Sequence, residues 1–145
     1  MTTFTPKSTE VKIKLGTVPG KTKKVAEFVS YIFNCRNVVH MLHLKTNSFA
    51  AHKALDTFYN EVIEIIDSIA EVSQGYLGET LSGYMDFPMA KYENYNPVVY
   101  LKEVREYVRS KRYTDFSKEY SPIQNELDNL ENLLNQTLYK LEQLK

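Results

Sequence analysis

The residues best suited to metal chemistry are concentrated between positions 40 and 71 of this 145-residue chain. This segment holds every histidine of the chain and three carboxylates that follow at helical spacings: His40, His43, His52, Asp56, Asp67 and Glu71. Imidazole and carboxylate groups suit Fe(II), Zn(II) or Mn(II), and no group of thiolates is present to favour another metal. The segment is therefore either a metal site or the polar margin of a buried helix.

Four of these residues form one stripe on a helix expected from about Phe49 to Ser73. Each helical residue advances about 100°, so Asp56, Asp67 and Glu71 lie near 40°, 60° and 100° when His52 is set at zero. The apolar residues of the same helix centre near 260° on this scale, so the stripe borders the core. His52 with Asp56, and Asp67 with Glu71, are i,i+4 pairs, so the members of each pair can act together.

The length of this helix limits what the stripe can do within one chain. His52 and Glu71 are separated by about 28 Å along the axis at 1.5 Å per residue. One helix cannot close both ends around a single ion. If all four residues form one site, a second subunit must supply half of it, and a two-fold antiparallel pairing of this helix would do so.

Three further helices are expected around this one. Apolar residues at a 3.6-residue period predict a helix from about Lys23 to Lys45. Small polar residues then break the pattern, and Asn47 or Ser48 can cap the next helix, which is expected to stop before Gly75. A third helix is expected from Pro97 or Val98 to about Arg112.

The last helix has a clear start signal in Ser121 as N-cap, Pro122 in the first turn and Gln124 completing a capping box. Its packing seam follows 4-3-4-3 spacing at Ile123, Leu127, Leu130, Leu134, Thr137, Leu141 and Leu144. Asp128 and Glu131 fall outside this seam and are expected to be solvated.

The loop lengths predict the connectivity. Two short loops make antiparallel helix pairs, whereas residues 75–97 form a long connection rich in Gly, Pro, Tyr and Asn. We therefore expect an all-α fold: a ferritin-like four-helix bundle, residues 23–145, with a long crossover between the second and third helices. Residues 1–22 are expected to form a basic, extended N-terminal arm.

Charge and cysteine content narrow the class of protein. Residues 1–24 carry six lysines and one glutamate, a net charge of +5, and the whole chain is neutral. Such an arm could touch DNA electrostatically, and its candidate residues are Lys12, Lys14, Lys21, Lys23 and Lys24. The single cysteine, Cys35, is expected in the core of a protein from a reducing compartment. Neither a secretory signal nor a membrane span is evident, so we expect a soluble intracellular protein.

The stretch AAHKALDTFYNEVIEIIDSIAE resembles the second-helix pattern of the Dps (DNA protection during starvation) branch of the ferritin-like superfamily. The resemblance implies that His52, Asp56, Asp67 and Glu71 are metal ligands at a site between two-fold-related subunits. A gapless register places the family's upstream histidine at His40. The His-Leu dipeptide, standing where the family has His-Trp, points instead to His43.

The chain also resembles small ferritin-like proteins encoded by tailed bacteriophages, through Ser48–Tyr59 and through Ile123–Lys145. It departs from ordinary ferritins because it has no Glu-x-x-His, which excludes their di-iron site within one subunit. The family's Trp-Asn after the first histidine is also absent.

These resemblances imply a Dps-like iron-binding protein, with Zn or Mn as alternatives to Fe, that assembles as a homo-oligomer or shell. Whether it oxidises Fe(II) with peroxide or dioxygen, and whether it binds DNA, stays open. The alternative is a non-enzymatic phage accessory or virion protein that uses the bundle for interactions. The expected location is the cytoplasm of a bacterial host, or the virion.

Overall fold

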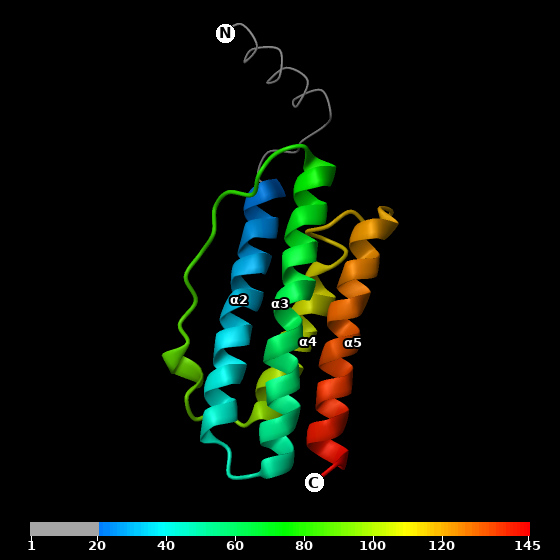
Figure 1. Ribbon diagram of the computed structural model, residues 1–145. Helices are drawn as coiled ribbons and strands as arrows, with labels where there is room; N and C mark the ends of the chain where they lie inside the picture. Colours follow the sequence, from blue (N-terminus) through cyan, green and yellow to red (C-terminus); the bar gives the residue numbers. More distant parts are fainter. Residues whose placement is uncertain (1–20) are drawn as a thin grey trace, which may run out of the picture.

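The computed structural model describes residues 21–145, where the chain forms α-helices and one short 3-10 helix and no strand. The elements are α2 (Lys21–Lys45), α3 (Phe49–Leu77), the 3-10 helix η1 (Ala90–Tyr92), α4 (Pro97–Lys111) and α5 (Ser121–Gln143). The helices α2 and α3 are antiparallel, the crossover carrying η1 returns along the bundle, and α4 then runs parallel to α3 (Figure 1). The expected helical bundle with one long crossover is confirmed. Apart from Lys21 and Thr22, which begin α2, the expected basic arm lies outside the described residues.

The turn between α2 and α3 is closed by the cap that Ser48 provides. The Ser48 hydroxyl accepts a hydrogen bond of 3.1 Å from the Ala51 N–H. The Ser48 N–H in turn donates to the Thr46 hydroxyl at 3.1 Å. Of the two predicted caps, the structure therefore uses Ser48, and this short turn fixes α3 beside α2.

The prediction that α3 stops before Gly75 is wrong. The helix runs through Gly75 to Leu77, and Gly78 (φ 76°) provides the left-handed cap, with its N–H on the Gln74 carbonyl at 2.9 Å. The additional turn buries Leu77, which is 7% exposed. The Gln74 side chain also accepts the Leu81 N–H at 3.0 Å. The burial of Leu77 and the hydrogen bonds of Gln74 thus outweigh the tendency of Gly75 to end the helix.

The crossover is attached to the side of α2. The Ser30 hydroxyl accepts the Met85 N–H at 2.9 Å. Tyr31 meets the Phe87 ring edge-on at 5.5 Å and stacks on Tyr107 of α4 at 3.6 Å. The contacts of Met85 and Phe87 tie the long connection to α2, and the connection leaves the outer face of α3 uncovered (Figure 1).

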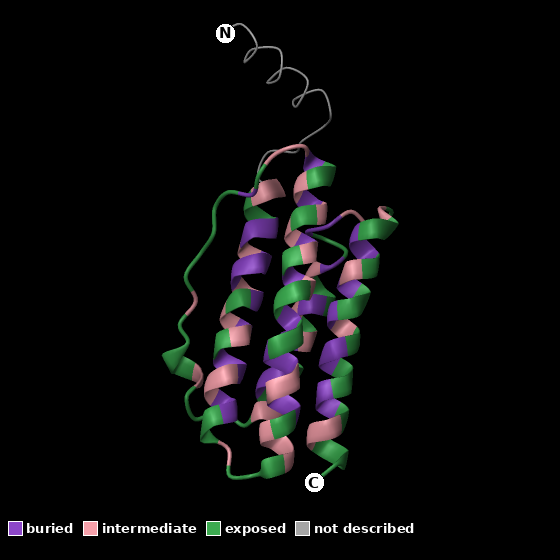
Figure 2. Ribbon diagram, in the orientation of Figure 1, coloured by how far each residue is buried: buried purple, intermediate pink, exposed green. Residues whose placement is uncertain are grey.

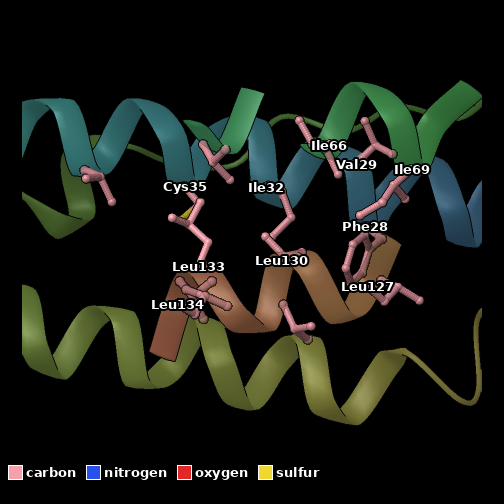
Figure 3. Close-up of a cluster of buried hydrophobic side chains, with 14 of the residues drawn as sticks. Phe28, Val29, Ile32, Cys35, Ile66, Ile69, Leu127, Leu130, Leu133 and Leu134 are labelled. Atoms are coloured by element: carbon pink, nitrogen blue, oxygen red, sulfur yellow. The ribbon is translucent and has the colours of Figure 1, made fainter. Parts of the chain in front are cut away.

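The core lies between all four helices (Figure 2). Every helix of the bundle contributes fully buried side chains to it, including Leu101 and Val104 of α4. Figure 3 labels those of α2, α3 and α5: Phe28, Val29, Ile32, Cys35, Ile66, Ile69, Leu127, Leu130, Leu133 and Leu134. Cys35 is a core residue as expected, and burial raises the pKa of its thiol to about 12. A cysteine in this state is not a nucleophile at neutral pH.

The seam of α5 is wider than its 4-3-4-3 spacing predicts. Its members from Ile123 to Thr137 are buried, but Leu141 is half-buried and Leu144 is 50% exposed beyond the helix end. Leu133 and Leu138 are buried in addition. A helix that contacts more than one neighbour needs this broader apolar face.

The predicted capping box of α5 is wrong. The N-cap residue is Tyr120, without a side-chain capping bond, and Ser121 is the first helical residue. The Gln124 side chain donates to the carbonyl oxygens of Arg112 and Ser117, both at 2.9 Å. Gln124 therefore joins α5 to the loop before it instead of capping its own helix.

Arg112 is the buried centre of this junction. Asp128 is exposed, as expected, but the Glu131 side chain is only 19% exposed, so the prediction that Glu131 is solvated is wrong. Its guanidinium donates to the Gln124 side chain, to Asp128 at 2.6 Å and to Glu131 at 3.2 Å. Although burial disfavours the charged form, these carboxylates raise the pKa of Arg112 above its ordinary value. Sequence spacing within α5 could not show that a cation from the end of α4 lies beside them.

Two glycine substitutions test the end of α3. Gly78→Ala is expected to lower the free energy of unfolding by about 1 kcal/mol, because Gly78 has a positive φ. Gly75→Ala is expected to raise it by about 0.5–1 kcal/mol, because Gly75 is helical and an added Cβ meets no atom within 4 Å. Urea denaturation of both variants measures the difference, and the opposite order would place the helix end at Gly75.

Arg112→Met is expected to lower the free energy of unfolding by about 2–4 kcal/mol, because it leaves buried hydrogen-bond acceptors unpaired. Arg109→Met is the matched control, since Arg109 pairs with the same Glu131 at 2.9 Å from a more exposed position. Its expected loss is below about 1 kcal/mol. Equal losses in urea denaturation would contradict the assignment of Arg112 as the anchor of α5.

Candidate functional site

The four stripe residues lie along the outer side of α3 in the order that helical geometry requires. His52 and Asp56 are half-buried in the first two turns, whereas Asp67 and Glu71 are exposed farther along. Asp56 accepts a hydrogen bond of 3.1 Å from the Asn60 side chain. Within the described chain, neither Asp67 nor Glu71 makes a side-chain hydrogen bond or an ion pair. The stripe thus presents two separate pairs of candidate metal ligands, His52 with Asp56 and Asp67 with Glu71.

His43 and His52 lock the two ends of the α2–α3 turn together. The Nδ1 of His43 lies 2.8 Å from the His52 carbonyl oxygen, and the Nδ1 of His52 lies 3.0 Å from the His43 carbonyl oxygen. The two rings also stack, with centroids 3.7 Å apart and an angle of 22° between their planes. We call this reciprocal pair the histidine latch.

The latch fixes the tautomer of both rings. A carbonyl oxygen can only accept, so both Nδ1 atoms carry the proton and, in the neutral ring, both Nε2 atoms keep a lone pair. A metal binds imidazole in the ring plane, about 2 Å from the nitrogen. Because the rings of His43 and His52 are nearly parallel, their planes do not meet at that distance. One ion can therefore be held by one ring of the latch and not by both.

The two candidates for the upstream ligand have different surroundings. His43 is 7% exposed and acts as the hydrogen-bonding and stacking partner of His52. His40 is half-buried and stacks on Tyr59 at 4.1 Å, with a 9° angle between the rings. The rings of His40, His52 and Tyr59 thus surround His43, and His43 supports His52 in the way that outer-shell residues orient metal ligands.

Tyr59 and Arg36 belong to this site and were not found from the sequence. Desolvation, followed by the hydrogen bond and charge of Asp56, raises the pKa of Tyr59. The Arg36 guanidinium lies 5.8 Å from the centre of the Tyr59 ring. Their spacings could have revealed them, since Tyr59 follows Asp56 by three residues and Arg36 precedes His40 by four.

A single chain does not gather a complete metal site. Among residues 21–145, no group of three or more His, Cys, Asp or Glu side chains is placed to hold a metal ion. This agrees with the separation of about 28 Å between His52 and Glu71 along one helix. The arrangement instead offers two half-sites, which we define as His52 with Asp56 and Asp67 with Glu71.

Only part of the candidate nucleic-acid surface can be placed. Lys21, Lys23 and Lys24 lie in the first turn of α2, and Lys12 and Lys14 lie outside the described residues. Within residues 21–145, none of the helices combines the length and apolar composition needed to cross a membrane. DNA binding stays a prediction.

Part of the chain is similar to an uncharacterized phage protein. It is 34% identical over 59 residues to the "Uncharacterized 14.6 kDa protein in mobD-ri intergenic region" of Enterobacteria phage T4. The matched segment is 41% of this chain and 46% of the phage protein, so the chain spans about half the length of that relative. No solved structure matches the chain. A family model matches residues 43–141, which include the latch, α3, α4 and most of α5, and the chain therefore belongs to the family of unknown function DUF5856.

Proposed function

We propose that the protein is a homodimer that binds Fe(II) between two antiparallel copies of α3. His52 and Asp56 of one copy face Asp67 and Glu71 of the other, which gives two equivalent sites per dimer. The observation that carries this proposal is the symmetry of the stripe. The two half-sites lie at equal distances on either side of one point of α3, between Glu61 and Val62. A two-fold axis at that point therefore brings each half-site to the complementary half-site of the other copy.

The surface at this centre is suited to pairing. Ile63 is 39% exposed, close to the middle of the stripe. Phe33 of α2 is 40% exposed. Counting ten residues back from His43 and ten forward from His52 along the two antiparallel helices brings Phe33 to the level of position 62, next to Ile63. A small apolar centre flanked by charged residues is typical of a protein–protein interface.

The donor set fits the proposed ion. One imidazole and three carboxylates suit Fe(II), and also Zn(II) or Mn(II). The latch supports the proposal because it directs the His52 lone pair to Nε2 and orients the ring before any metal arrives. The order of helices with one long crossover is that of ferritin-like bundles.

The resemblance to Dps proteins supports Fe(II) as a substrate that dioxygen or peroxide would oxidise. Bound iron is the reductant in that reaction, and the carboxylates of Asp56, Asp67 and Glu71 would stabilise the more highly charged Fe(III) product. A Dps-like shell would extend the same two-fold contact.

The second candidate is an interaction protein of a phage that binds no metal. It is favoured by the similarity to an uncharacterized phage protein and by the absence of a three-ligand group within residues 21–145. In that case the stripe is a polar protein-binding face. The two candidates differ in one measurable property, which is the affinity of the dimer for Fe(II).

Anaerobic titration calorimetry with Fe(II) tests the proposal. The wild-type dimer is expected to bind two ions, and Asp67→Asn is expected to weaken binding at least tenfold because the amide loses the ligand charge. Glu61→Gln is the matched control, since Glu61 is exposed and lies about 120° around α3 from Asp67 and about 80° beyond Glu71, off the stripe. Its affinity is expected to equal that of the wild type.

A wild-type dimer that binds no Fe(II) would contradict the metal proposal and favour the interaction protein. A wild-type monomer that binds Fe(II) would contradict the placement of the site between copies. Equal weakening by Asp67→Asn and Glu61→Gln would show that overall charge, and not the stripe, attracts the ion.

A further inference from the structure

Among the residues that the structure describes, Arg36 is a cation without a carboxylate partner, on the outer face of the α2–α3 pair. Within residues 21–145 it takes part in no ion pair, and its Nη1 reaches only the Asn37 side-chain oxygen at 3.3 Å. Its Nε is buried without a hydrogen-bond partner. The guanidinium lies over Tyr59, which is beside Asp56. The half-buried guanidinium of Arg36 therefore keeps N–H groups that still need hydrogen-bond acceptors.

The surroundings of Arg36 point to another protein surface as the source of the missing acceptor. Phe33 precedes Arg36 by three residues and is exposed, as is Ile63 on α3, one turn beyond Tyr59. The carboxylates of Asp67 and Glu71 are unpaired within the described chain and lie farther along α3. Cation, apolar centre and anions therefore follow one another across the same face.

We infer that Arg36 pairs with Asp67 of the partner subunit and orients that carboxylate at the shared site. The inference rests on the proposed function, because it uses the same two-fold axis. Arg36 lies beside Tyr59 at the same height along the bundle. The proposed two-fold axis places position 64 of the other copy opposite Tyr59. From there Asp67 is about 4.5 Å along the helix, within reach of an arginine side chain.

The direction around the helix selects Asp67 over Glu64. At about 100° per residue, Asp67 lies about 80° from Tyr59, whereas Glu64 lies about 140° from it and away from α2. A carboxylate has several lone pairs, so one oxygen can bind the ion while the other accepts from the guanidinium. Arg36 is thus a positioning residue that acts through Asp67.

A charge swap tests the pair without any metal. Sedimentation equilibrium in EDTA gives the dimer dissociation constant of the wild type, Arg36→Asp, Asp67→Arg and the double variant. Each single variant is expected to weaken the dimer at least tenfold, because it places like charges together. The double variant is expected to return to within about threefold of the wild type, since the pair is restored with reversed polarity.

The matched control combines Arg36→Asp with Glu64→Arg, which adds the same charges about 60° farther around α3 from Tyr59 than Asp67. It is expected to stay as weak as Arg36→Asp alone. Arg36→Gln keeps most of the side-chain stem over Tyr59, so it shows the loss of charge without loss of packing. Circular dichroism of every variant separates weak pairing from failure to fold.

The outcomes distinguish this inference from the proposed function. A wild type that is monomeric both in EDTA and with Fe(II) overturns the proposed function and the inference with it. A dimer that binds Fe(II) but is not weakened by Arg36→Gln or Arg36→Asp overturns the inference alone. Dimerisation that requires Fe(II), or equal rescue by Arg at position 64 and at position 67, also overturns it.

Discussion

The candidate site depends on one constraint, which is the distance that the rise of about 1.5 Å per residue sets between residues of the helix α3. The helix is continuous from Phe49 to Leu77, so its two pairs of donors stay far apart however the side chains rotate. No motion within an intact helix can bring His52 to Glu71. The stripe is either a polar surface or half of a shared site. The position of both pairs about one point, with exposed Ile63 near it, favours the shared site.

The histidine latch connects the fold to this chemistry. It closes a tight turn with two hydrogen bonds and a ring stack, and the same bonds decide which nitrogen of His52 keeps a lone pair. A histidine that appears in the sequence as a candidate ligand, His43, is therefore a support for its neighbour. Its burial explains why three histidines within thirteen residues need not mean three ligands.

Periodicity within single helices was sufficient to predict most of the fold. The apolar spacing of α2 and α3 and the proline at the start of α4 correspond to the observed elements. The errors lie where partners distant in sequence compete with local signals. Gly75 stays helical because the next turn buries Leu77. The Gln124 side chain forms no capping box because it hydrogen-bonds to Arg112 instead.

The same limit applies to the candidate site. The angular positions of Asp56, Asp67 and Glu71 around α3 follow from 100° per residue and could be predicted. The stacking of His40 on Tyr59 and the unpaired donors of Arg36 depend on how α2 lies against α3, and no periodicity within one helix contains that information.

Anomalous diffraction from crystals grown with Mn(II), which suits the same ligands as Fe(II) and resists oxidation, tests the shared site most directly. The predicted result is one anomalous peak per chain between two-fold-related copies of α3. Each peak should lie about 2.0–2.3 Å from Nε2 of His52 and from an oxygen of Asp67 of the partner subunit. Crystals in which the α3 faces do not pair, or a peak held by residues of one chain alone, would contradict it.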